Sequence, residues 1–104
     1  MSENNKVLRH LVLFAFMAGV APGHVKDIQQ GFGELPGKIS QIVAYEWGIN
    51  NSPENLNQGF THCFLLSFGS EADRDAYLVH PAHQEFVARL GPVLEKALVV
   101  DYWA

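Results

Sequence analysis

The sequence predicts a single α+β domain whose strands and helices follow the order β-α-β-β-α-β. Runs rich in β-branched and aromatic residues favour strands at residues 7–16, 39–50, 60–68 and 98–103. Apolar residues at helical spacing fill the two long intervals that remain. The chain has 104 residues, 48% hydrophobic and 17% charged, so we expect one folded core rather than disorder.

The first strand and the first helix occupy the N-terminal third of the chain. Residues 1–6 are polar and are expected to be a disordered tail, which leaves residues 7–104 as the domain. After the strand at 7–16, Pro22 opens a helix. Its apolar face consists of Val25, Ile28, Phe32 and Leu35. The stretch LPGK at 35–38 ends this helix.

The C-terminal half contains a helix that we expect to be interrupted. Ser70 followed by Asp73 resembles a capping box and starts the helix. Residue His80 precedes Pro81, and a residue before proline disfavours the helical conformation. Pro81 suits the first turn of a second helical segment. The sequence therefore predicts a break at His80–Pro81 before the last strand.

This order of elements is the ferredoxin-like arrangement, in which a four-stranded antiparallel sheet carries its helices on one face. The strands at 7–16 and 60–68 are apolar in both phases, a pattern typical of strands buried on both faces. The helices cover only one face. We therefore expect a homodimer whose sheets pack face to face. The alternative is a monomer in which this apolar face of the sheet is exposed to solvent.

Charge and cysteine content exclude several classes of function. The net charge is −4 and no basic stripe exists, which argues against nucleic-acid binding. The apolar run from Leu11 to Ala21 is too short to cross a bilayer, so we interpret it as strand rather than as a signal peptide or membrane anchor. The lone Cys63 excludes an intrachain disulfide and fits a reducing, cytoplasmic location.

Several titratable rings are expected to meet over the helix-covered face of the sheet. His10 and His62 share the inward phase of their strands, and with these strands taken as parallel both lie at the same end of the sheet. Asp101 of the last strand comes to that end as well. The helix break, which carries Tyr77 and His83, packs over the same region. The predicted result is a half-apolar cavity lined by titratable side chains.

Such a cavity suits acid–base chemistry. A neutral imidazole can accept a proton near neutral pH, and a phenol can donate a hydrogen bond to a developing oxyanion. Taken singly, His10 and His62 also suit hydrogen-bonded core positions, and His80 suits a helix cap. A zinc site built from His10, His62 and His83 lacks a recognisable motif, so no metal and no cofactor are expected.

Six motifs occur in order: RHLVLFAF, LPGKI, WGINNS, GFTHCFLLSF, YLVHPAHQEF and VVDYW. Together they resemble the stress-responsive dimeric A/B barrel (Dabb) family and, within it, members of the olivetolic acid cyclase type. The resemblance implies a ferredoxin-like protomer in a homodimeric barrel. It also implies that Tyr77 and His83 form an acid–base pair and that His10 and His62 line the substrate pocket. Ala15 departs from the family, which commonly has lysine there.

Two functions follow from these observations. The first is a small, cofactor-independent acid–base enzyme of cyclase, aldol, isomerase or lactone type that acts on a small carbonyl or polyketide-like compound. His83 is then the base, Tyr77 the proton donor, and His10 and His62 the substrate-binding residues. The alternative is a non-catalytic, stress-related dimer or a protein that binds a small hydrophobic ligand in the same cavity.

Overall fold

The computed structural model describes residues 6–104, so most of the predicted tail at 1–6 lies outside the described residues. The order of strands and helices is the predicted one, with the second helix in two pieces. The elements are β1 (Leu8–Phe16), α1 (Pro22–Lys38), β2 (Ile42–Ile49), β3 (His62–Phe68), α2 (Glu71–Val79), α3 (Pro81–Leu90), the 3-10 turn η2 (Gly91–Val93) and β4 (Leu94–Trp103).

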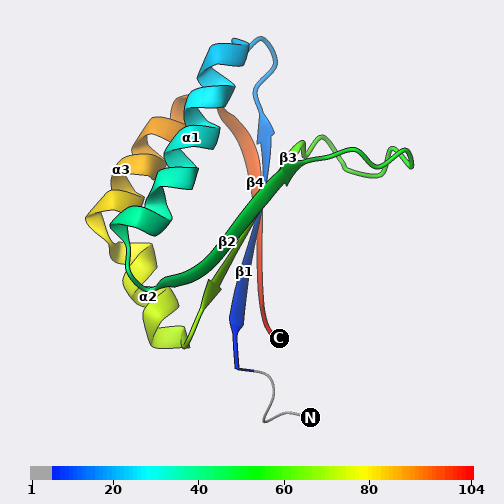
Figure 1. Ribbon diagram of the computed structural model, residues 1–104. Helices are drawn as coiled ribbons and strands as arrows, with labels where there is room; N and C mark the ends of the chain where they lie inside the picture. The colour runs from blue at the N-terminus through cyan, green and yellow to red at the C-terminus, as the bar shows by residue number, and fades with distance from the viewer. Residues whose placement is uncertain (1–5) are drawn as a thin grey trace.

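The four strands form one antiparallel sheet in the order β2-β3-β1-β4. Figure 1 shows the helices together on one side of this sheet, which is the predicted ferredoxin-like arrangement. The expected parallel pairing of the first and third strands is wrong. The α1 crossover makes β2 run in the direction of β1, and β3 then reverses and inserts between them, so β3 is antiparallel to β1.

The ends of several elements differ from the predicted ends. β4 begins at Leu94, four residues before the predicted start at 98. Leu94 and the exposed Lys96 continue the pairing with β1, and the exposed Glu95 lies between them at a shift in the register. Polar residues are tolerated there because β4 is an edge strand. α1 continues through Pro36, so the LPGK stretch forms its last turn rather than following it.

The helix break at His80–Pro81 is confirmed. His80 is extended, with φ −64° and ψ 137°, and it ends α2 and begins α3. Its Nδ1 accepts a hydrogen bond of 3.0 Å from the backbone N–H of Ala82, and Pro81 is the first residue of α3. Ser70 caps α2 in the same way, because its Oγ accepts from the backbone N–H of Asp73 at 3.0 Å.

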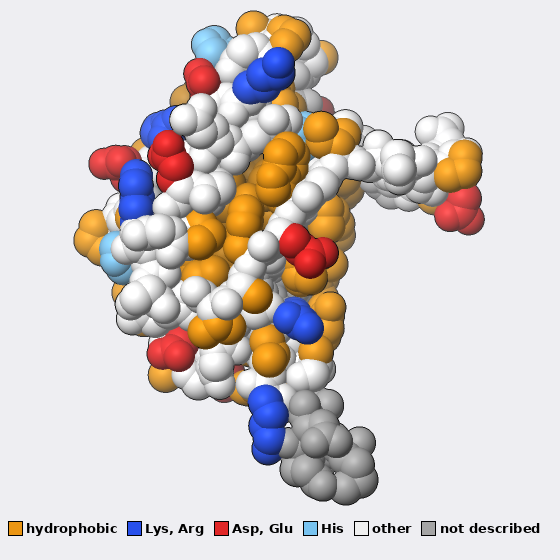
Figure 2. All heavy atoms as spheres, viewed as in Figure 1, with side chains coloured by type: hydrophobic (Ala, Val, Ile, Leu, Met, Phe, Trp, Pro, Cys, Tyr) orange, Lys and Arg blue, Asp and Glu red, His pale blue; other side chains and the backbone are white. Residues whose placement is uncertain are grey.

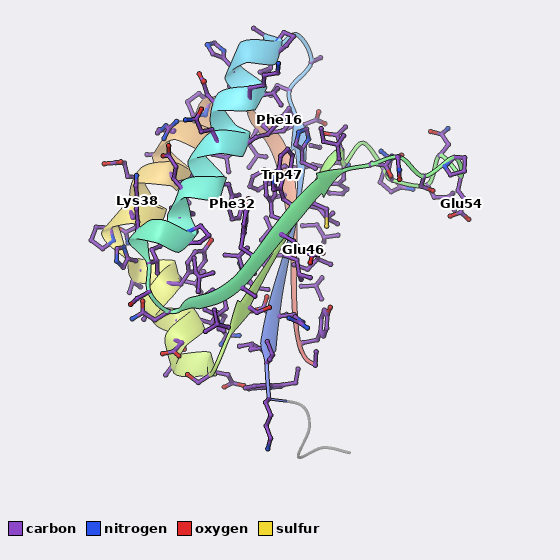
Figure 3. All side chains as sticks on the ribbon, viewed as in Figure 1. Phe16, Phe32, Lys38, Glu46, Trp47 and Glu54 are labelled. Atoms are coloured by element: carbon purple, nitrogen blue, oxygen red, sulfur yellow. The ribbon has the colours of Figure 1, made fainter. Side chains whose placement is uncertain are left out.

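The hydrophobic core lies between the helices and the inner face of the sheet. Phe32 of α1 stacks on Phe64 of β3 with ring centroids 4.2 Å apart, and Phe14 and Phe86 pack against this pair. Figure 3 shows Phe32 reaching from α1 toward the sheet. The core comes to the surface between α1 and β2, where Figure 2 shows a strip of hydrophobic side chains and where Trp47 is 42% exposed.

The outer face of the sheet carries apolar side chains and has no helix over it (Figure 1). Leu98, Val100 and Tyr102 of β4 are 45%, 48% and 46% exposed. Leu11 and Leu13 of β1 pair with Val100 and Leu98 and share this face. The two-sided apolar pattern read from the first strand therefore corresponds to one covered and one open face. An open apolar face of this kind is typical of a surface that meets another protein.

The substitution Tyr45→Phe is expected to stabilise the fold. Tyr45 Oη is buried and, within residues 6–104, is the one such side-chain atom without a hydrogen-bond partner. The same burial raises the pKa of Tyr45 to about 12. Removal of this hydroxyl keeps the ring on Phe32 and should raise the free energy of unfolding by about 1 kcal/mol in chemical denaturation.

The matched control is Ser40→Ala, which removes a hydroxyl from an exposed side chain and should leave the free energy of unfolding unchanged. A loss of stability in Tyr45→Phe, relative to this control, would show that the Tyr45 hydroxyl stabilises the native state through a bond to solvent or to another group.

Candidate functional site

A cavity of about 560 Å³ lies between the helices α2 and α3 and the strands β1 and β4. Most of its wall is apolar and includes Phe86 and Leu90 of α3. Three of the predicted site residues, His10, Tyr77 and His83, line it together. The structure therefore brings a histidine of the sheet and the two residues that flank the helix break to one place.

His83 lies in the first turn of α3, and its hydrogen bond decides which ring nitrogen is free. Its Nδ1 lies 3.1 Å from the backbone carbonyl oxygen of Leu78. A carbonyl oxygen can only accept, so Nδ1–H donates and Nε2 of the neutral ring keeps its lone pair. Burial lowers the pKa of His83 below its ordinary value of 6.5, although the bond to Leu78 partly opposes this. His83 is therefore a neutral base at pH 7.

Tyr77 lies in the last turn of α2 and is 1% exposed. Its ring centroid is 4.4 Å from that of His83 and 5.7 Å from that of His10. Burial raises the pKa of Tyr77 well above its ordinary value of 10.0, so the phenol stays protonated at neutral pH. The break at Pro81 lets these two rings meet although their residues are six positions apart.

His10 is held by a short chain of charged groups. Its Nδ1 lies 2.7 Å from Oδ1 of Asp101, the residue directly opposite on β4. A carboxylate can only accept, so Nδ1–H donates to Asp101 and fixes the orientation of the ring. The Asp101 Oδ2 accepts from Nη1 of Arg74 at 3.1 Å, and Nε of Arg74 donates to Asp75 at 3.0 Å. This chain leaves Nε2 of neutral His10 without a proton.

Arg74 and Asp75 also line the cavity, and neither was predicted from the sequence. Arg74 is three residues before Tyr77 on α2, and residues at this spacing lie on the same face of a helix. This spacing was the available signal for Arg74. The contact with Asp101 depends on a pairing between residues 27 positions apart, which helical spacing does not show.

The structure does not bring His62 to this cavity. In the pairing of β1 with β3, His62 is opposite Phe14, whereas His10 is opposite Leu66. The expectation that His10 and His62 lie at the same end of the sheet is therefore wrong. The reason is the antiparallel direction of β3, which places its first residue near the end of β1 rather than near its start.

Both ring nitrogens of His62 have hydrogen-bond partners. The Gln29 side-chain amide lies 2.7 Å from Nε2 and donates to it, and Nδ1–H donates to Oγ1 of Thr61 at 2.7 Å. The ring lies parallel to that of Trp47, at 6.2 Å, with the edge of Phe16 against it. Burial lowers the pKa of His62, which keeps the ring neutral. His62 thus joins α1 to the sheet as a hydrogen-bonded core residue.

Residues 6–104 contain neither a group of side chains that could bind a metal ion nor a helix that could span a membrane. Over this part of the chain, no three side chains of His, Cys, Asp or Glu are grouped closely enough to hold a metal ion. The three histidines considered as zinc ligands do not meet, because His62 lies away from the other two. Over the same residues, no helix has the length and apolar character needed to cross a membrane.

Two curated relatives align along nearly the whole chain. A stress-response A/B barrel domain-containing protein of Arabidopsis thaliana is 37% identical over 102 residues, which are 98% of this chain and 94% of the relative. Olivetolic acid cyclase of Cannabis sativa is 25% identical over 95 residues, 91% of this chain and 94% of the cyclase. The likeness therefore extends to a domain of the same size.

Two solved structures are similar in fold. Hydroxynitrile lyase from Passiflora edulis superposes with a TM-score of 0.89 at 25% identity, covering 96% of this chain and 94% of the lyase. A protein of Bacteroides fragilis, described as dimeric with a ferredoxin-like fold, superposes with a TM-score of 0.77 at 27% identity, covering 95% of this chain and 97% of that protein. Both support the ferredoxin-like fold.

The family profile of the stress responsive A/B barrel domain matches residues 8–104, which is the whole domain from the start of β1. The six sequence motifs, the fold and the relatives agree with this match. The chain belongs to the stress-responsive A/B barrel (Dabb) family.

Proposed function

We propose that this protein is a cofactor-independent acid–base enzyme that removes a proton from the carbon next to the carbonyl of a small compound. One observation carries the proposal: the free Nε2 of His83 belongs to a ring 4.4 Å from the protonated phenol of Tyr77, in a cavity of about 560 Å³. A base and a hydrogen-bond donor on one apolar cavity are what enolisation of a carbonyl compound needs.

The reaction begins when Nε2 of His83 accepts the proton from the carbon. The electron pair of the broken C–H bond moves into the C–C bond, and the carbonyl π pair moves to the oxygen. The hydroxyl of Tyr77 donates a hydrogen bond to this oxyanion, which is stronger when apolar walls exclude water. Protonated His83 then returns its proton to the product, and cyclase, aldol, isomerase and lactone chemistry can all start from this enolate.

His10 is assigned a substrate-binding role, and His62 is not. The Nε2 of neutral His10 is an acceptor on the cavity wall, and Asp101 fixes the ring that carries it. A hydroxyl of the substrate can donate to this nitrogen. His62 has both nitrogens bonded and lies outside the cavity lining, so we assign it to the packing of α1 on the sheet.

Two relatives support an enzymatic function, because one is named as a cyclase and another as a lyase. Both names denote enzymes that act on small molecules. The alternative is a non-catalytic protein that binds a small hydrophobic ligand, which the apolar wall of the cavity would also suit.

We also propose that the protein forms a homodimer through the outer faces of two sheets and that it is located in the cytoplasm. The open apolar face and the similar fold of a dimeric protein support the assembly. The loop at residues 50–61 projects on the side opposite the helices (Figure 1), and a hollow of about 570 Å³ between this loop and Leu13, Leu65 and Leu98 could receive side chains of a second copy. The single thiol of Cys63 supports a reducing compartment.

Proton abstraction can be tested before the natural substrate is identified. The protein is incubated in D₂O with a panel of small ketones, and loss of the proton signal next to the carbonyl is followed by NMR. We expect exchange faster than in buffer for at least one ketone. Ketones that bind in the cavity without faster exchange would contradict the enzyme proposal and favour the ligand-binding alternative.

The exchange rate is expected to depend on pH in one direction near neutrality. His83 must be neutral to accept a proton, and its pKa lies below 6.5, so the rate should fall only as the pH drops below that value. The pKa of Tyr77 lies well above 10.0, so no alkaline loss is expected up to that pH. A rate profile from pH 5 to pH 9, measured with a bound ketone, checks this. A rate that falls between pH 7 and pH 9 would contradict Tyr77 as the proton donor, and a protein-catalysed rate that keeps rising through this range would contradict His83 as the base.

A further inference from the structure

The charges on the cavity wall do not sum to a positive value. Among the described residues that line the cavity, Arg74 is the only lysine or arginine. Its guanidinium contacts two carboxylates, Asp101 at 3.1 Å and Asp75 at 3.0 Å. With His10 neutral the four groups carry a net charge of −1, and with His10 protonated they carry none. The positive charge of Arg74 is therefore matched before any ligand arrives.

The uncharged polar groups of the cavity determine which hydrogen bonds a ligand can make there. His83 offers Nε2 as an acceptor, because Leu78 holds its Nδ1–H. When its ring is neutral, His10 also offers Nε2 as an acceptor, because Asp101 holds its Nδ1–H. Tyr77 offers a hydroxyl that stays protonated. A ligand that satisfies all three groups has a hydrogen-bond acceptor for Tyr77 and donors for the two imidazoles.

We infer that this cavity takes an uncharged carbonyl compound that also carries a hydroxyl or enol group, and that it discriminates against carboxylates. A carboxylate would have to lie beside Asp75 and Asp101 and would offer no donor to His10 or His83. A ketone accepts from Tyr77, and a neighbouring hydroxyl donates to an imidazole nitrogen. The inference rests on the proposed function only in treating this cavity as the place where the substrate binds.

Two probes of nearly equal shape test whether the cavity prefers an uncharged ketone to a carboxylate. Para-hydroxyacetophenone and para-hydroxybenzoate share the ring and the hydroxyl, and they differ in having a methyl ketone or a carboxylate. Their dissociation constants for the full chain are measured by NMR titration at pH 7, with the amide signals of Tyr77 and His83 reporting the cavity. We expect the ketone to bind at least about tenfold more tightly than the acid.

A charge variant tests the cause. Asp75→Asn removes a largely exposed carboxylate beside Arg74 and leaves the Arg74–Asp101 pair in place. The ratio of the dissociation constant of the acid to that of the ketone should therefore fall about threefold. Asp27→Asn removes an exposed carboxylate of α1, outside the cavity lining, and should leave the preference unchanged.

Three outcomes would overturn the inference: equal or tighter binding of the acid, binding of neither probe at millimolar concentration, and an Asp75→Asn preference identical to that of Asp27→Asn. Failure of the proposed function is distinguishable from these. Tight ketone binding without deuterium exchange contradicts the enzyme proposal while it supports the ligand class inferred here.

Discussion

His83→Ala is expected to slow deuterium exchange next to the carbonyl of a bound ketone by roughly 10² to 10⁴, the range that general base catalysis contributes. The variant removes the proposed base, whose Nε2 is free because its Nδ1–H is held by the Leu78 carbonyl. Ketone binding should change far less than the rate, because Tyr77 and most of the apolar wall remain. NMR of the exchanging proton gives the rate, and NMR titration of the same ketone gives the dissociation constant.

The sequence offers a matched control three residues earlier. His80 belongs to the same stretch, but it caps α3 through its Nδ1 and is not among the residues that line the cavity. Asn is an equally good helix cap, so the rate at which His80→Asn exchanges the ketone proton should lie within about twofold of the rate of the unchanged protein. If His83→Ala exchanged as fast as His80→Asn, the acid–base proposal would be wrong.

Local patterns were sufficient for the features that depend on a few neighbouring residues. A proline after His80 restricts the backbone of His80 whatever the rest of the chain does, so the break could be predicted. Strand phase is also local, and it placed His10 and Phe14 on the covered face and Leu11 on the open face. The antiparallel direction of the first and last strands placed Asp101 at the same end of the sheet as His10, where the structure pairs the two residues.

Strand direction depends on how the chain is connected, and there the prediction failed. With β3 antiparallel to β1, His62 pairs with Phe14, four residues along β1 from His10. At about 3.4 Å per residue, this displaces the His62 ring by roughly 14 Å from the expected place. One reversed strand therefore removed one of the four predicted residues from the site, while the residues carried by the helix break stayed in it.

Contacts made by long side chains are the other feature of the site that could not be predicted from the sequence. Arg74 reaches Asp101 across the gap between α2 and β4, and this contact depends on the docking of a helix against the sheet rather than on any spacing in the sequence. The sequence therefore predicted the rings of the site but not the charges beside them. Those charges lead to the inferred preference for an uncharged ligand.

Leu65→Glu is expected to convert a homodimer into a monomer. Leu65 lies in the central strand β3, paired with Leu11 of β1, on the open face of the sheet. A two-fold dimer through this face introduces each substitution twice, so two carboxylates would be buried in the interface without partners. Sedimentation velocity at micromolar concentration should show about twice 11.6 kDa for the unchanged protein and 11.6 kDa for the variant.

Val79→Glu is the matched control, because it places the same carboxylate at the end of α2, on a side chain that is 68% exposed. This variant should sediment as the unchanged protein does, and circular dichroism should show that both variants are folded. The proposed dimer fails if the unchanged protein already sediments at 11.6 kDa, or if Leu65→Glu remains a dimer. The second result would place the contact elsewhere, since an apolar face that tolerates two buried carboxylates is not the interface.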